Sequence, residues 1–211
     1  MKPSYLILVL FLVQLPISSV SAQEGNATFI VQVRTGKGKV PMAFHTRGAD
    51  YGCYVGYHEY NRPAIPIETN GEIFIPDSVL TPDGQRLPVR WISRGSFQGC
   101  QNITKVHLPH AIEYISDLAF QNCKSLREIT LSDSLRHIYP QAFMGCKALQ
   151  RVILHSPNPP RTYAEGTFEQ KVLNTTTVVF PSVSAKKNWD YSVFSHFRYH
   201  VEYIPTYPED K

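Results

Sequence analysis

The sequence predicts a short solenoid of class α+β, built from 23-residue repeats. Two observations lead to this prediction. Three consecutive segments align at a constant offset of 23 residues, and each copy continues into a unit in which apolar and polar residues alternate. The recurring columns are Ile92/Ile115/Ile138, Phe97/Phe120/Phe143 and Cys100/Cys123/Cys146. Because one copy cannot bury its own apolar face while stacked copies bury one another's, the repeats are expected to stack along one axis.

Each repeat is expected to contribute one short strand and one or two helical turns. The strand follows from columns of period 2, in which two residues of each copy point inward. These columns are Val106/Ile129/Val152 and Leu108/Leu131/Leu154. The Phe-x-x-Cys-x-x-(Ile/Leu) spacing is that of helical turns on the opposite wall. Segments 73–76 and 178–181 have the form of the strand unit, so about five parallel strands are expected.

The chain is expected to contain four parts: a signal peptide at 1–22, a small β-rich unit at 23–70, the capped solenoid at 71–205 and a tail at 206–211. In the second part, 26–33 and 39–44 alternate like strands around a turn at 35–38. The composition of 81–84 predicts a further hairpin.

The C-terminal end of the solenoid is expected to be closed by a helix and a strand. Ser184 is placed to cap a short helix, which would contain Lys186, Lys187 and Trp189. Segment 199–204 alternates and is expected to form the closing strand.

The first 22 residues have the composition of a secretory signal peptide. Lys2 supplies the positive end, the apolar run at 5–13 is too short to span a bilayer, and small residues precede Gln23. No second apolar stretch approaches the ~20 residues that a membrane helix needs. We therefore expect a secreted or cell-surface protein, or a periplasmic one, with no membrane insertion after the signal is removed.

Charge and motif content argue against nucleic-acid binding and against catalysis. The net charge of +4 falls to +3 without Lys2, and basic residues are not clustered, so no nucleic-acid partner is expected. In the segment Gly95–Gly99 the serine is second instead of central, which is not a nucleophile elbow. The pair His58-Glu59 lacks the second histidine of a zinc protease. Neither an enzyme nor a cofactor is therefore expected.

The cysteines are expected to be buried free thiols. Cys100, Cys123 and Cys146 occur once per repeat, with Cys53 outside the repeats, and no C-x-x-C pair could chelate a metal, so no metal site is expected. Their column is surrounded by Phe and Leu, where a small thiol fills volume. Since neighbouring strands lie ~4.8 Å apart, a disulfide between adjacent repeats is the alternative.

The pattern F-x-x-C-x-x-L-x-x-I-x-L-P, the Pro159-Pro160 pair after the last full repeat and the Trp-containing end resemble the BspA-like leucine-rich repeat proteins. The resemblance extends over roughly residues 71–204. It implies a right-handed leucine-rich repeat solenoid, export to a bacterial surface, and attachment to host proteins or other cells. It implies no catalytic residue.

Two outward-facing columns of the strand ladder are candidate binding surfaces. The charged column is Glu72, Lys105, Glu128, Arg151 and Thr177; it is either a polar binding strip or a device that fixes strand register. The mixed column is Phe74, His107, Thr130, Ile153 and Val179, of which three are apolar. It is either an interaction site or a face covered by another segment. The candidate ligand-binding residues are Phe74, Lys105, His107, Glu128, Thr130, Arg151 and Ile153.

The sequence therefore predicts a non-enzymatic binding module that recognises an extracellular protein or a glycan. The alternative is a self-associating structural component that uses Phe74, Ile153 and Val179. Five strands present on the order of 300 Å², whereas a standard interface needs ~800 Å² per partner. Binding would thus be weak, recruit neighbouring loops, or involve a small ligand.

A cluster of tyrosines in the N-terminal unit is a second candidate surface. It could stack on sugar rings, or it could simply pack a small sheet against its neighbour. Its members are Tyr51, Tyr54, Tyr57 and Tyr60.

Overall fold

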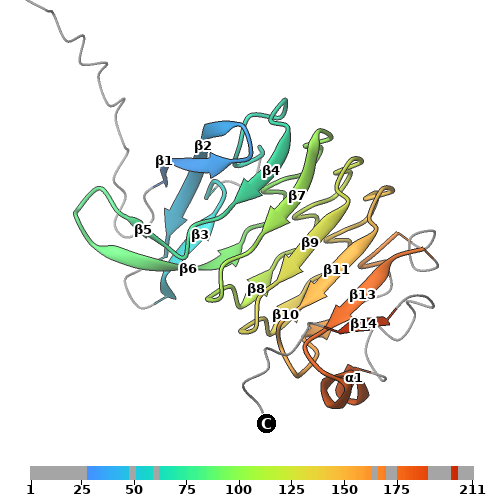
Figure 1. Cartoon of the computed structure of the whole chain (residues 1–211). Helices are drawn as coiled ribbons and strands as arrows, with labels where there is room; N and C mark the ends of the chain where they lie inside the picture. Colours follow the sequence, from blue (N-terminus) through green and yellow to red (C-terminus); the bar gives the residue numbers. More distant parts are fainter. Residues whose placement is uncertain are drawn as a thin grey trace, which may run out of the picture.

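Two ladders of short parallel strands form opposite walls of the solenoid (Figure 1). The computed structural model describes residues 28–47, 51–58, 62–162, 166–169, 175–189 and 201–203. The first ladder contains β4 (Gly71–Phe74), β7 (Ile103–His107), β9 (Glu128–Leu131), β11 (Arg151–Leu154), β13 (Thr177–Phe180) and β14 (Val201–Tyr203). The second contains β6 (Arg86–Ile92), β8 (Tyr114–Ile115), β10 (His137–Ile138) and β12 (Arg161–Thr162). The solenoid and the strands of its first ladder are thus confirmed, and the second ladder was not predicted.

The register of the first ladder follows the 23-residue offset. Val106 lies opposite Ile129, and Ile129 opposite Val152, so the apolar column points into the core at every strand. The neighbouring residues on each strand point outward and are half-buried. Alternation along a strand therefore sets both the core and the outer face of this wall.

The predicted helical turns are wrong, because these segments form tighter turns. The N–H of Cys100 donates to the carbonyl of Phe97 at 3.1 Å, and the bonds Cys123–Phe120 and Cys146–Phe143 have the same three-residue span. Left-handed backbone at two positions of every repeat interrupts a helix. These positions are Gly95, Leu118 and Gln141, and Gly99, Asn122 and Gly145. Within the described ranges the one α-helix is α1 (Val183–Trp189).

The N-terminal strands connect the two ladders. β1 (Thr28–Thr35) and β2 (Gly38–Thr46) form the predicted hairpin, and β3 (Cys53–Val55) pairs with β2. β1 also pairs with β4 of the first ladder, while β3 pairs with β6 of the second. The hairpin predicted at 81–84 joins β5 (Ser78–Leu80) to β6. One sheet path therefore runs from β12 through the N-terminal strands to β14.

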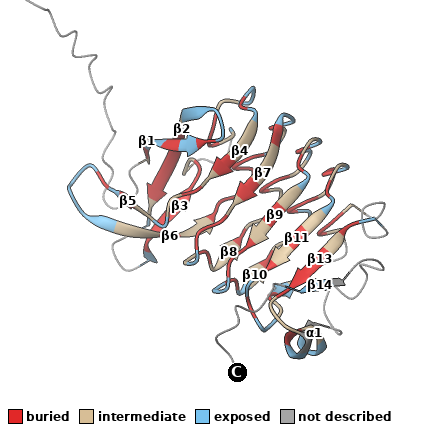
Figure 2. Ribbon diagram, in the orientation of Figure 1, coloured by how far each residue is buried: buried red, intermediate tan, exposed pale blue. Residues whose placement is uncertain are grey.

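A row of stacked, buried phenylalanines lies in the turns that lead from the second ladder to the first. Figure 2 shows that buried segments recur on both ladders and on the turns between them. Phe97, Phe120, Phe143 and Phe168 are spaced 4.9, 5.2 and 5.0 Å apart between ring centroids, and neighbouring rings are within 7° of parallel. Phe29 and Phe44 of the N-terminal hairpin belong to the same apolar cluster. The hairpin thus closes the core at this end.

The C-terminal helix begins earlier than predicted. The N–H of Ala185 donates to Ser182 Oγ at 3.1 Å, so Ser182 is the capping residue and the assignment to Ser184 is wrong. Lys186, Lys187 and Trp189 lie in this helix as predicted. The closing strand is confirmed as β14, which is parallel to β13; the remainder of 199–204 lies outside the described residues.

All four cysteines are buried free thiols, as predicted, and the disulfide alternative is not adopted. Cys123 Sγ donates to the carbonyl of Phe97 at 3.1 Å, and Cys146 Sγ to that of Phe120 at the same distance. Burial raises the pKa of Cys53 to about 11 and that of Cys100 to about 12. Burial also raises the pKa of Cys123.

We expect the native protein to resist thiol reagents. The thiolate is the reactive species, and both burial and a raised pKa suppress it. Titration with an aromatic disulfide reagent at pH 8 should give no fast reaction, whereas the denatured chain should titrate four thiols without a reductant. Fewer than four thiols after denaturation would demonstrate a bridge.

Candidate functional site

The charged column of the first ladder is neutralised internally. Glu128 accepts from Lys105 Nζ at 2.8 Å and lies 3.6 Å from Arg151 Nε. Arg151 Nη1 donates to Glu202 of β14 at 2.8 Å. These charges bind the strands to one another, which supports the register-fixing interpretation over that of a free polar strip.

The mixed column contains a stack of three groups at its N-terminal end. The Phe74 and His107 rings lie 4.3 Å apart and 2° from parallel. The guanidinium of Arg34, on β1, lies over the Phe74 ring at 3.9 Å from its centroid. Such an arrangement combines a cation–π contact with ring stacking. His107 Nε2 also lies 3.4 Å from Glu72 Oε2.

The rest of the mixed column is less exposed than predicted. Thr130 and Ile153 are half-buried, and Val179 is only 5% exposed, so its predicted solvent exposure is wrong. Val179 lies between Ile153 on β11 and Glu202 on β14 in the strand register. The predicted closing strand, β14, therefore flanks Val179, which agrees at this position with the alternative of a face covered by another segment.

A groove of about 600 Å³ opens where the first ladder meets the N-terminal hairpin. Its sides are formed by residues 31–34 of β1, by residues 74–80, and by the end of β7. Phe74 and His107 lie in its lining, together with Arg34 and Arg86. This groove brings two of the seven predicted site residues together with side chains from β1 that the sequence did not associate with them.

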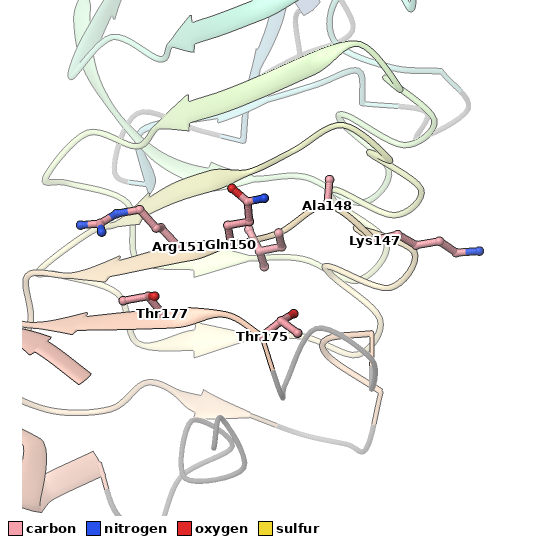
Figure 3. A pocket seen from close by; sticks show the side chains of 7 residues that line it. Lys147, Ala148, Gln150, Arg151, Thr175 and Thr177 are labelled. Atoms are coloured by element: carbon pink, nitrogen blue, oxygen red, sulfur yellow. The ribbon is translucent and has the colours of Figure 1, made fainter. Parts of the chain in front are cut away.

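A second, smaller hollow lies between β11 and β13 (Figure 3). It measures about 460 Å³ and has a polar lining with two cations, Lys147 and Arg151. Thr175 and Thr177 form the opposite side. Arg151 is already paired with Glu128 and Glu202. This hollow therefore has fewer charged groups free to contact a ligand than the groove has.

An aromatic row on the second ladder was not predicted from the sequence. Trp91 and Tyr114 stack at 3.7 Å and 8°, and Tyr114 and His137 at 5.2 Å and 8°. Tyr54 of β3 stacks on Trp91, and His45 of β2 on Tyr54. The signal was available, because positions 91, 114 and 137 share the 23-residue offset. Since each inner ring has its faces covered by its neighbours, the row mainly stabilises the ladder.

The tyrosine cluster of the N-terminal segment does not form one surface. Tyr54 is buried in the aromatic row, and Tyr57 packs under Arg62, whose guanidinium lies 3.7 Å from the ring centroid. Tyr51 is exposed. Tyr60 lies outside the described residues. Packing is thus the better interpretation for the two tyrosines with neighbours.

His45 should make stability depend on pH. Burial lowers the pKa of this histidine to about 4 from an ordinary 6.5, and its Nδ1 lies 3.1 Å from the Gly56 carbonyl. The unfolded chain therefore takes up a proton below pH 6.5 that the folded chain accepts only near pH 4. This contribution to stability is complete above pH 6.5, falls as the pH decreases towards 4, and amounts to at most about 3 kcal/mol.

Urea unfolding between pH 4 and 7 measures this effect. In His45→Gln, where the side-chain amide can still donate to Gly56, the slope of unfolding free energy against pH should be smaller than in the wild type. An unchanged slope would assign the acid sensitivity to other groups, such as His137, whose pKa burial also lowers.

Among the described residues, no group of three or more His, Cys, Asp or Glu side chains is arranged to hold a metal ion. In the same part of the chain, no helix is both long and apolar enough to cross a membrane.

The two parallel ladders and the 23-residue period define a leucine-rich repeat solenoid. The chain belongs to the BspA type leucine rich repeat family, whose pattern matches residues 86–199 in six copies. The resemblance noted from the sequence is therefore confirmed. Members of this class are repeat proteins whose stacked surfaces serve in binding and recognition.

Three solved structures are similar to this chain. A leucine-rich repeat protein from Bacteroides capillosus is 27% identical, with a TM-score of 0.51, over 71% of this chain and 96% of that one. A leucine-rich repeat protein from Bacteroides ovatus is 20% identical, with a TM-score of 0.43, over 74% of this chain and 36% of that one. A leucine rich cell surface protein from Faecalibacterium prausnitzii is 18% identical, with a TM-score of 0.48, over 82% and 43%. No curated protein matches the sequence.

Proposed function

We propose that this protein is an exported, non-enzymatic recognition module that binds an extracellular partner, a protein or a glycan, in the groove between β1, residues 74–80 and the end of β7. The observation that carries the proposal is the half-buried Phe74, held between Arg34 and His107 and open to a groove of about 600 Å³. The composition of residues 1–22 supports export. Membership of a family of surface-exported repeat proteins supports a role in recognition.

The groove also adds contact area to that of the strand ladder, which alone is too small for a standard interface. The outer faces of the first ladder amount to on the order of 300 Å², and ion pairs already engage their charges. Side chains of β1 and of residues 76–80 add a second wall to this surface. A partner seated there would contact both the ladder and the hairpin, as a standard interface requires.

Self-association through Phe74, Ile153 and Val179 has less support. Val179 is buried, and Arg34 covers one face of Phe74. The apolar patch that the alternative requires is thus smaller than predicted. Sedimentation of the chain from Gln23 onward at increasing concentration tests this alternative, and we expect a monomer.

A charge reversal at the groove tests the proposal. The chain from Gln23 onward would be screened against immobilised matrix proteins and glycans, beside Arg34→Glu and the matched control Lys37→Glu in the turn of the same hairpin. Arg34→Glu should weaken binding by about tenfold or more, because it replaces a cation that lines the groove with a carboxylate. Lys37→Glu should bind like the wild type. Equal binding by both variants would place the recognition site elsewhere on the molecule.

A further inference from the structure

One edge of β1 has almost no strand partner. β1 pairs with β2 along its whole length, from Thr28 opposite His45 to Thr35 opposite Gly38. On its other side, β1 meets β4 only at Thr35, opposite Ile73. Within the described ranges no strand pairs with this side over residues 28–33. An exposed edge of this kind can template pairing with another chain.

The hydrogen-bond pattern identifies the backbone groups on this edge. The N–H of Gly36 donates to the Glu72 carbonyl at 3.0 Å, so even-numbered positions direct their backbone groups away from β2. By alternation, Ile30 and Gln32 direct their N–H and C=O groups to the same side, where no strand lies opposite. Pro41 faces Gln32 in the register and has no N–H, which agrees with a pair that is not hydrogen-bonded.

This edge borders the groove. Residues 31–34 form one of its sides, and Ser78, Val79 and Leu80 line it from β5. Leu80 is 56% exposed, and Ile30, on the free edge, is 51% exposed. The open backbone edge is therefore flanked by apolar surface, as a bound strand would require.

The charges around the groove favour an acidic ligand. Its lining contains Arg34 and Arg86, and Asp77 is its one carboxylate among the described residues. The two lining histidines already face acids, His107 beside Glu72 and His110 beside Asp133. The excess of positive charge complements acidic side chains on a partner.

We propose that the groove binds an extended polypeptide, which adds to the sheet as a strand along β1 and carries apolar and acidic side chains at alternating positions. This inference rests on the function proposed above and specifies its partner. A glycan offers hydroxyl groups, whereas only a polypeptide repeats N–H and C=O groups at the spacing of a strand edge. Main-chain bonds to Ile30 and Gln32 give affinity, and contacts with Leu80, Arg34 and Arg86 give selectivity.

The experiment uses the chain from Gln23 onward and a pooled library of acetylated linear peptides in which apolar and acidic residues alternate. Gln32→Pro removes one N–H from the open edge and no bond of the β1–β2 ladder; Gln32→Ala is the matched control. The peptides enriched on the wild type should bind Gln32→Pro about tenfold more weakly, and Gln32→Ala within about threefold of the wild type. Equal affinities of the two variants would overturn the proposal.

Backbone methylation of the peptide provides a test on the unmodified protein, should Gln32→Pro fold poorly. Alternate amides of a bound strand point to β1, and the others point away. Methylating one alternate set should abolish binding, while methylating the other should leave it unchanged. Hydrogen exchange should then show protection of the Ile30 and Gln32 amides on peptide binding, with little change at Val31. Equal effects of the two methylated sets, or no enriched peptide, would contradict strand addition.

The outcomes separate this inference from the function on which it rests. If Arg34→Glu weakens binding of a protein or glycan and Gln32→Pro does not, the groove is the recognition site and strand addition is wrong. If neither variant affects binding, both proposals are wrong. If the chain dimerises with protection of the Ile30 amide, the occupant is a second copy and the proposed partner is wrong.

Discussion

Replacing Phe120 with alanine is expected to lower the free energy of unfolding by about 3–5 kcal/mol. Phe120 is fully buried between Phe97 and Phe143, with ring centroids at 4.9 and 5.2 Å. Its N–H donates to the Ala142 carbonyl at 2.8 Å, which holds the backbone of adjacent repeats together. The neighbouring rings therefore cannot move in to fill the cavity, and the full cavity penalty should appear.

The loss at Phe120 should exceed that at the end of the row. Phe168 stacks on Phe143, the last of the three repeat phenylalanines, so Phe168→Ala removes one ring contact where Phe120→Ala removes two. Urea unfolding followed by circular dichroism measures the free energy of unfolding of both variants. In thermal unfolding, the Tm of Phe120→Ala should fall by roughly 10 °C. Phe120→Leu, which retains much of the volume, should lose less than half as much. Equal losses at the two positions would show that the row does not act as a continuous core.

Replacing Gly52 with alanine is expected to have the second largest effect, a loss of about 2–4 kcal/mol. Gly52 has φ +77°, where any Cβ is strained, and a Cβ there would lie 2.6 Å from the Pro88 carbonyl oxygen. It would also lie 3.1 Å from Arg90 Cδ. Because Pro88 O belongs to the backbone, it can move only if β3 and β6 separate, which would loosen the pairing between Cys53 and Val89.

A matched glycine separates strain from collision. Gly84 has φ +84°, but a Cβ there would meet no atom within 4 Å, so Gly84→Ala carries the backbone strain alone, about 1–2 kcal/mol. Unfolding free energies of the two variants give the difference directly, and hydrogen exchange should show faster exchange of the β3 amides only in Gly52→Ala. Equal losses would indicate that β6 tolerates the displacement.

The first ladder was predictable because its strands are three to five residues long and keep a period of two, as in Ile103–His107. The second ladder was not, since β8 and β10 are two residues each. Their columns keep the 23-residue offset, but two residues are too few to show the alternation of a strand. The error over helical turns has a comparable cause. Left-handed backbone recurs at Gly95, Leu118 and Gln141. Of these three, only glycine is a residue type from which positive φ is expected.

The positions of the candidate site residues were predicted, but their surroundings were not. The strand register places Phe74 beside His107, as the columns indicated. The contact of Arg34 with Phe74 depends on the pairing of β1 with β4, which is antiparallel and confined to one residue of each strand. No repeat pattern contains such a contact, so the groove could not be anticipated from the sequence.

The bonding of the N-terminal hairpin to both ladders has a consequence for how such a chain can change. The sheet path has its two ends at β12 and β14, at the opposite end of the molecule from the hairpin (Figure 1). Gain or loss of a whole 23-residue unit by recombination within the gene would shift the C-terminal strands by one strand position along each ladder. The bonds of the hairpin, and the groove beside it, would be unchanged. The length of the solenoid and its recognition surface can therefore vary independently.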